Sequence, residues 1–330
     1  MRTVVLAAAV ILAFAVAGIA AADGLPVLGI DVGSQGVTVP GGPDRYVTIN
    51  DGKTTLLERI ARNGGRVEQT MRMTGTFTIP AVAYDSSASG LSADGGTLVL
   101  IQPRQSFPRA TTTFALLDVP SLFLRRTFTL RGDFSFDAVS PHGRTMFLIN
   151  YTSPDPTRYT VRAYDLTANT LLAKPIVDPA EPSDKMRGGP ITRLAGVGGR
   201  WAYTLYDGAG ATPFVHALDT VTGRAHCTAL PMLFGRQDLA SLRFRRESGT
   251  KIGVEASGTA VAVVDTATFA ASVPPVAGTS NLRLWPIGAA GLFAALALLA
   301  ALAVTRSRRS RARNEAEVLD PRERVVEVVQ

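Results

Sequence analysis

Short apolar runs recur along the middle of the chain, and each has the length of a single β-strand. They are YVTI at Tyr46, LVLI at Leu98, MFLI at Met146, AYTL at Ala202 and IGVE at Ile252, at intervals of 48 to 56 residues. Most of them follow a turn of small or polar residues, such as Asp94-Gly95-Gly96 or His142-Gly143. Tight turns favour these residue types. The pattern therefore predicts a repeated unit of turn and strand.

A second element follows these runs and places an aspartate at the same point of the last four units. The aspartates are Asp118 in ALLDVPSL, Asp165 in RAYDLTANT, Asp219 in HALDTVTGR and Asp265 in VVDTATF, while Ala61 holds this position in the first unit. An aspartate that begins a turn accepts a hydrogen bond from the backbone two residues on. Each unit is therefore predicted to contain two hairpins, which make one four-stranded antiparallel sheet.

One four-stranded sheet cannot bury both of its faces, so successive units must pack on one another. Units of this length that pack radially form a β-propeller. The predicted fold is therefore all-β, a β-propeller of about five or six four-stranded blades over residues 23–271. A sixth blade would combine residues 24–40 with the last strands before residue 276. A β-sandwich and an open β-solenoid are the alternatives.

The turn-plus-strand pattern resembles the YVTN and WD40-like repeats of bacterial β-propellers. The resemblance covers roughly residues 40 to 270 and is carried by LSADGGTLVLI, VSPHGRTMFLI and ALDTVTGR. It implies the fold and neither a ligand nor a reaction. No unit ends in Trp-Asp, which separates the chain from the eukaryotic type of WD40 repeat.

Both ends of the chain indicate export and anchoring. Residues 1–22 hold one arginine, an apolar run and a close of small residues, which predicts a signal peptide cleaved after Ala22. An uncleaved anchor is the alternative. Residues 272–283 are a Pro and Gly linker, and the uncharged stretch from Leu284 to Thr305 predicts one transmembrane helix, with a buried core helix as the alternative.

The residues that flank this helix predict its orientation. Trp285 stands where an interfacial aromatic residue is expected, and the run is followed by Arg306, Arg308, Arg309, Arg311 and Arg313. Arginines behind an apolar run mark the cytoplasmic side, so residues 306–330 are predicted to be a cytoplasmic tail. The protein is predicted to cross the cell membrane once, with its N-terminal domain outside and its arginines near lipid head groups.

Composition narrows the classes of partner. The net charge of +7 leaves only +4 in residues 23–283, where 26 basic residues stand against 22 acidic ones. A mild, spread charge does not predict nucleic-acid binding, which needs a clustered basic face. Cys227 is the single cysteine, so no intrachain disulfide forms.

Three motifs partly match a phosphate-binding, a catalytic or a calcium-binding pattern, but none of them completes it. LGIDVGSQGVT at residues 28–38 looks like the phosphate motif of sugar kinases, yet Pro40-Gly41-Gly42 follows at once. Asp137, Ser140 and His142 supply the residue types of a catalytic triad within one turn, and other units lack the set. The loop VDPAEPSDKMRGGP lacks the ligand spacing of a calcium loop. Each is therefore interpreted as structural.

The hairpin FVHALDTVTGRAHC offers a candidate metal pair. If Asp219 to Gly223 form a five-residue loop, His216 faces His226 on one side of the sheet. Two imidazoles can fill two corners of a zinc site. No third ligand can be named, and the alternative is two cross-strand residues that bind nothing.

These observations predict a binding or scaffold module that uses the loops at one end of the propeller for a protein or small-molecule ligand. No catalytic residue and no cofactor is predicted. A propeller-type hydrolase or lyase with a site at the mouth of the channel is the alternative, because propellers host enzymes as well.

The topology is open to a direct test. A reporter that works only outside the membrane should be active when fused at Val276, and a cytoplasmic reporter should be active when fused after Asn314. Neutralising Arg306, Arg308 and Arg309 together should weaken the orientation bias without changing the fold of the outer domain. Reversed reporter activities would contradict the predicted location.

Overall fold

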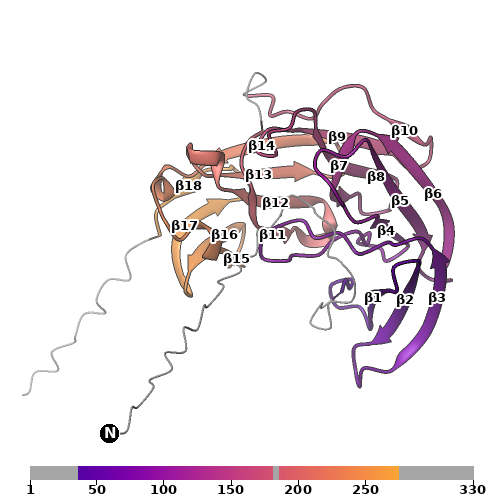
Figure 1. The fold of residues 1–330 in the computed structure, drawn as a ribbon. Coiled ribbons are helices and arrows are strands. Elements are labelled where there is room, and N and C mark those ends of the chain that lie inside the picture. The colour runs from indigo at the N-terminus through magenta and orange to yellow at the C-terminus, as the bar shows by residue number, and fades with distance from the viewer. Residues whose placement is uncertain (1–35, 181–185, 275–330) are drawn as a thin grey trace, which may run out of the picture. The chain divides into compact units, whose positions relative to one another are not determined.

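The computed structural model describes residues 36–180 and 186–274, which lie in one compact unit. These residues form five antiparallel sheets that follow one another along the chain (Figure 1). The first sheet holds β1 (Asp44–Asn50), β2 (Thr54–Ala61) and β3 (Val67–Thr74). The second holds β4 (Thr97–Ile101), β5 (Thr111–Asp118) and β6 (Phe123–Arg131).

The other three sheets have four strands each. The third holds β7 (Asp133–Val139), β8 (Thr145–Tyr151), β9 (Thr160–Asp165) and β10 (Thr170–Leu171). The fourth holds β11 (Pro190–Ala195), β12 (Trp201–Tyr206), β13 (Phe214–Asp219) and β14 (Arg224–Ala229). The fifth holds β15 (Arg243–Arg246), β16 (Lys251–Ala256), β17 (Thr259–Asp265) and β18 (Ala271–Ser272). Short 3-10 turns occur at η1 (Val197–Gly199), η2 (Gly208–Gly210), η3 (Pro231–Leu233) and η4 (Leu239–Ser241).

Every sheet has the same topology, in which neighbours along the chain are neighbours in the sheet. The first two sheets gain a short first strand from the bridges Val37↔Tyr46 and Leu91↔Leu98. With these additions each unit has four strand positions in the order of the sequence. The recurrent apolar runs noted in the sequence all fall on the second position, in β1, β4, β8, β12 and β16.

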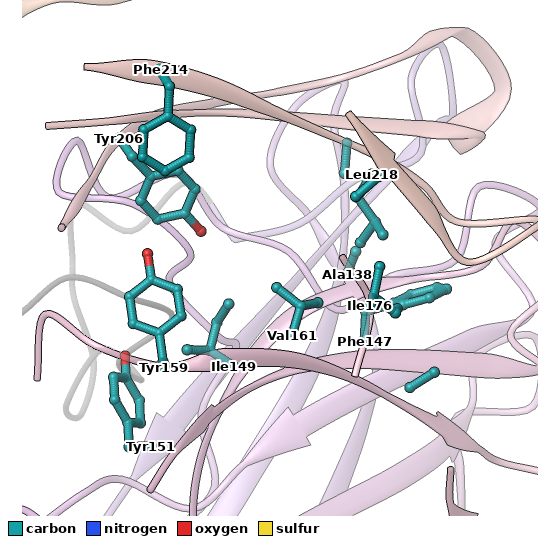
Figure 2. Close-up of a cluster of buried hydrophobic side chains, with 13 residues drawn as sticks. Ala138, Phe147, Ile149, Tyr151, Tyr159, Val161, Ile176, Tyr206, Phe214 and Leu218 are labelled. Atoms are coloured by element: carbon teal, nitrogen blue, oxygen red, sulfur yellow. The ribbon is translucent and has the colours of Figure 1, made fainter. Parts of the chain in front are cut away.

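Buried side chains join each sheet to the next one. Leu57 packs with Leu100 between the first and second sheets, and Phe114 packs with Met146 between the second and third. The cluster between the third and fourth sheets brings Tyr159 opposite Tyr206 (Figure 2). Val215 and Val264 belong to the cluster between the fourth and fifth sheets. Successive sheets thus cover each other's apolar faces.

The prediction of an all-β fold built from repeated sheets is therefore confirmed. Within the described residues, no buried cluster joins the fifth sheet to the first, so a closed ring is not observed there. In the same residues, no helix has the length and apolar character needed to cross a membrane. The predicted signal peptide, the membrane helix at 284–305 with Trp285, and the tail with its arginines lie outside the described residues.

The repeated aspartates begin turns, as predicted. Asp165, Asp219 and Asp265 each accept hydrogen bonds from the backbone N–H groups two and three residues on, at 2.8 to 3.1 Å. Asp118 accepts a bond from the Ser121 N–H at 3.2 Å. Asp219 also binds Arg200 at 2.8 Å, which ties the turn after β13 to the turn before β12.

Removing the Asp219 carboxylate should destabilise the domain. Burial alone would raise the pKa of Asp219, but the bonds from Arg200 and from the turn N–H groups bring that pKa below its ordinary value. Asp219→Ala should therefore lower the free energy of unfolding by about 2 kcal/mol, because a charged acceptor loses several donors. Urea unfolding measures this change. Asp219→Asn keeps an acceptor for the turn and should cost less; equal losses in both variants would contradict the turn mechanism.

Candidate ligand pocket at the inner strands

A pocket of about 490 Å³ lies among the first strands and first turns of four sheets. Its walls are residues 36–40 beside β1, residues 87–89 and 91–93 beside β4, Ala138 and Val139 of β7, and several residues from Arg193 of β11 to Ala202 of β12, with Thr220. This volume lies within the range of about 300 to 1,000 Å³ that is usual for ligand sites. The pocket is therefore large enough for a small ligand.

The first turns of the second and third sheets have matching internal bonds. The Ser92 hydroxyl accepts a bond from the Thr97 N–H at 2.9 Å, and the Ser140 hydroxyl accepts one from the Thr145 N–H at 2.9 Å. The two turns also touch, since the Asp94 N–H donates to the Pro141 carbonyl at 3.1 Å. These bonds fix the rim of the pocket at Ser92.

Close packing of these turns requires a glycine at position 143. Gly143 has a φ of +63°, and a Cβ atom there would lie 2.2 Å from the Thr97 hydroxyl oxygen. The glycine of the repeated turn motif is thus needed for contact between neighbouring sheets.

The connection between the first two sheets reaches the fourth sheet. The Tyr84 N–H donates to the Pro190 carbonyl at 2.8 Å, and the Asp85 N–H donates to the Ile191 carbonyl at 3.3 Å. The Thr192 hydroxyl donates to the Asp85 carboxylate at 2.6 Å. This connection is bonded to the first half of β11, while residues 87–89 and the second half of β11 line the pocket.

The rim carries two exposed apolar side chains on the fourth sheet. Val197 is 89% exposed between the lining residues Gly196 and Gly198, and Val221 is 62% exposed beside the lining residue Thr220. The Thr220 N–H donates to the Arg200 carbonyl at 2.8 Å, which holds both turns at one end of the sheet.

Arg193 is the charged residue among those that line the pocket, and its charge is balanced. Its guanidinium binds the Asp137 carboxylate and donates to the Asp137 carbonyl at 3.0 Å. The Arg193 side chain is 9% exposed and that of Asp137 is 3% exposed. Because both charges are buried together, this wall of the pocket is close to neutral.

A row of polar residues continues from Arg193 across the fourth sheet. The strand register pairs Arg193 with Thr204, Thr204 with His216, and His216 with Cys227. We call these four residues the polar row. They share the face of the sheet that packs against the third sheet, where Leu218 and Ala225 also lie. The Thr204 hydroxyl and the Arg193 Nε are buried and have no hydrogen-bond partner in the described part of the chain.

His216 is uncharged at neutral pH in this setting. It is 2% exposed, and burial lowers the pKa of its imidazole to about 4, against a weaker opposing effect of Asp137. Arg193 lowers this pKa further, and Asp178 raises it. A neutral imidazole inside an interface between sheets makes the fold sensitive to acid.

The triad types do not assemble. Asp137 binds Arg193, while His142 is 77% exposed and lies 3.2 Å from Asp94. Ser140 accepts bonds from its own turn, as Ser92 does in its turn. The interpretation of these residues as parts of turns agrees with this geometry.

The predicted facing of His216 and His226 is wrong. Asp219 pairs with Arg224, so the loop of the hairpin has the four residues Thr220–Gly223 and not five, and every later pair shifts by one. His226 therefore pairs with Ala217, on the face opposite to His216. It stacks on Phe269 at a centroid distance of 4.2 Å.

The described residues also contain no group of three or more His, Cys, Asp or Glu side chains placed to hold a metal. In the loop considered for calcium, Asp178 accepts bonds from the Ala180 and Cys227 N–H groups. Glu181 and Asp184 lie outside the described residues, as do most residues of the 28–38 motif.

Sequence reasoning missed the pocket and its Arg193–Asp137 pair. The available signal was a single arginine inside the otherwise uncharged strand PITRLA. Its partner lies 56 residues earlier, in a strand of the neighbouring sheet. No pattern within one strand identifies such a pair.

No family model matches the chain, and no curated protein matches it. Similar solved structures include TolB from Acinetobacter baumannii, with 17% identity over 69% of this chain and 51% of that chain and a TM-score of 0.39. A prolyl endopeptidase has 14% identity over 71% of this chain and 35% of its own, with a TM-score of 0.40. The β-propeller domain of Cps50 (Swd1) from Myceliophteria thermophila has 12% identity over 74% and 66%, with a TM-score of 0.40.

The chain thus spans about half of the TolB chain and about a third of the endopeptidase chain. At these identities and TM-scores the likenesses say nothing of activity, ligand or partner. The described residues show repeated four-position antiparallel sheets that cover each other's apolar faces, as the resemblance to bacterial propeller repeats implies.

Acid should destabilise the protein through His216. Since its folded pKa is about 4 and its ordinary value is 6.5, the unfolded chain binds more protons between these two values. The free energy of unfolding should therefore fall by roughly 3 kcal/mol from this group as the pH drops from 7 to 4. Urea unfolding across this range should show a smaller fall in His216→Gln. Identical pH profiles for the two proteins would refute the assignment.

Proposed function

We propose that this protein is a membrane-anchored, extracytoplasmic binding module whose ligand enters the pocket among the first strands and first turns of the sheets. One observation carries the proposal: strands and turns from four successive sheets surround a single space of about 490 Å³. Convergence of repeated units on one space is how a repeated fold produces one site from many similar loops.

The chemistry of the walls favours an uncharged ligand of mixed polarity. The positive charge of Arg193 is balanced by Asp137, and the other lining residues carry no charge. Val37, Val39 and Leu91 supply apolar surface. The Ser89 hydroxyl, half-buried in the wall, supplies a polar group. Burial of a charged ligand group here would leave it without a counter-charge, which is costly.

The anchoring belongs to the proposal and is supported by the sequence. The signal-like residues 1–22 and the apolar stretch 284–305 with its arginines favour an outward-facing domain held at the membrane by one helix. The same proposal includes a propeller of five or six blades, because five sheets with matching topology are present.

Filling the pocket should abolish binding. Ala88 is exposed and lines the pocket, so Ala88→Trp places an indole in the space without removing a buried group. The probes are a set of amino-acid amides and monosaccharides, tested by saturation-transfer NMR on the full chain in detergent. We expect some of them to bind the wild type, and to bind Ala88→Trp with an affinity at least tenfold lower. Ala240→Trp, on the exposed turn η4 and outside the pocket wall, is the matched control and should keep them.

Two results would contradict the proposal. The first is a set of binders that Ala88→Trp and Ala240→Trp retain equally, since the pocket would then not be the site. The second is chemical conversion of a binder during the measurement with loss of conversion in Ala88→Trp, which would favour an enzyme over a binding module.

A further inference from the structure

A second cluster of charged residues lies at the opposite end of the sheets from the pocket. The segment between β4 and β5 carries Arg104 and Arg109, and Asp133 begins β7. The pocket is lined by turns that join first and second strands, whereas this segment joins a second strand to a third. Since strand direction alternates, the two kinds of connection lie at opposite ends of a sheet. The cluster is therefore independent of the proposed pocket.

Two guanidinium groups share one carboxylate in this cluster. Arg104 donates to Asp133 Oδ1 from Nε at 3.1 Å and from Nη2 at 2.6 Å. The Arg109 backbone N–H donates to Asp133 Oδ2 at 2.9 Å. The side chains of Arg104 and Arg109 are each 9% exposed, and that of Asp133 is 1% exposed. One buried negative charge thus faces two buried positive charges.

The excess positive charge affects the pKa of Arg109. Burial, and then the neighbouring Arg104, lower the pKa of its guanidinium to about 10, while Asp133 and Tyr151 act in the opposite direction. Arg109 Nε lies 3.4 Å from Asp133 Oδ1 and makes no hydrogen bond within the described residues, whereas the two terminal nitrogens of Arg109 donate to the Gln102 carbonyl at 2.9 Å and to the Phe134 carbonyl. A buried cation without a full counter-charge is costly, so a further anion would stabilise this arrangement.

An aromatic surface lies beside the two arginines. The Arg104 guanidinium carbon is 5.4 Å from the centre of the Phe107 ring and 5.1 Å from that of Tyr151. Phe107 is 36% exposed and meets Tyr151 edge-on at 5.3 Å. A ligand that approaches Arg104 from solvent therefore meets the Phe107 ring as well.

We propose that Arg104 and Arg109 form a binding site for one carboxylate group, with Phe107 packing on the carbon atoms that carry it. A single carboxylate matches the single excess charge, and its planar oxygens suit a guanidinium fork. The group belongs to a small organic acid or to the carboxylate of a peptide. Both present the same chemistry to the two arginines.

Benzoate is the probe that tests this site, and benzamide, of the same shape without the charge, is its control. Thermal unfolding of the full chain is measured at increasing ligand concentrations. The unfolding temperature should rise with the concentration of benzoate and should not change with benzamide. Arg104→Gln should weaken benzoate binding at least tenfold, because a charge-assisted hydrogen bond is lost. Arg125→Gln, which removes the Arg125–Asp118 pair in the same sheet, should bind benzoate like the wild type.

A second variant keeps the test decisive if Arg104→Gln fails to fold. Phe107→Ala leaves the charged groups in place and should weaken benzoate binding several-fold. A tripeptide with a free C-terminal carboxylate is compared with the same tripeptide in its amidated form. Binding of the free form alone would identify a peptide carboxylate as a ligand. Binding of neither form, with benzoate still bound, would identify a small acid. Equal effects of benzoate and benzamide, or unchanged benzoate binding in both Phe107→Ala and Arg104→Gln, would overturn the proposal.

Discussion

The structure depends on the need of each small sheet to cover two apolar faces. Leu98 and Leu100 of β4 face the first sheet, while Val99 and Ile101 of the same strand face the third, and all four are fully buried. Each such side chain contributes about 1.5 to 3 kcal/mol when removed from water. A strand that is apolar on both sides has no stable place in an isolated sheet. Stacking of successive sheets follows from this, and it brings first strands from four of them around one pocket.

Polar side chains are also buried between these stacked sheets, and they affect how neighbouring sheets are aligned. The polar row lies among the apolar side chains that join the third and fourth sheets, and of its four residues only Arg193 lines the pocket. The Arg193–Asp137 pair stabilises neither sheet alone, since its two charges come from different sheets. It fixes how β7 and β11 are aligned at the edge of the pocket. Loss of either partner would leave an unpaired buried charge at the binding wall.

Local features were predicted well from the sequence, and features that depend on turn length or distant pairing were not. The second strand of every unit and the aspartate turns were found because each is encoded in a few adjacent residues, as at Met146 and Asp165. The His216 and His226 pair failed because a single residue of loop length reverses which face a side chain occupies. The pocket was expected only as loops at one end, because its walls come from residues 36 to 220. No repeat pattern encodes such convergence.

The bond between Asp85 and Thr192 has a consequence for how the chain acquires its structure. These residues are 107 positions apart, and the connection between the first two sheets is completed only by the fourth. A chain that emerges from its N-terminus cannot finish its early sheets before residue 192 has appeared. Long-range closures of this kind slow folding and prolong the exposure of apolar strands. The apolar strands of the first half of the domain would therefore stay uncovered until the second half has been made.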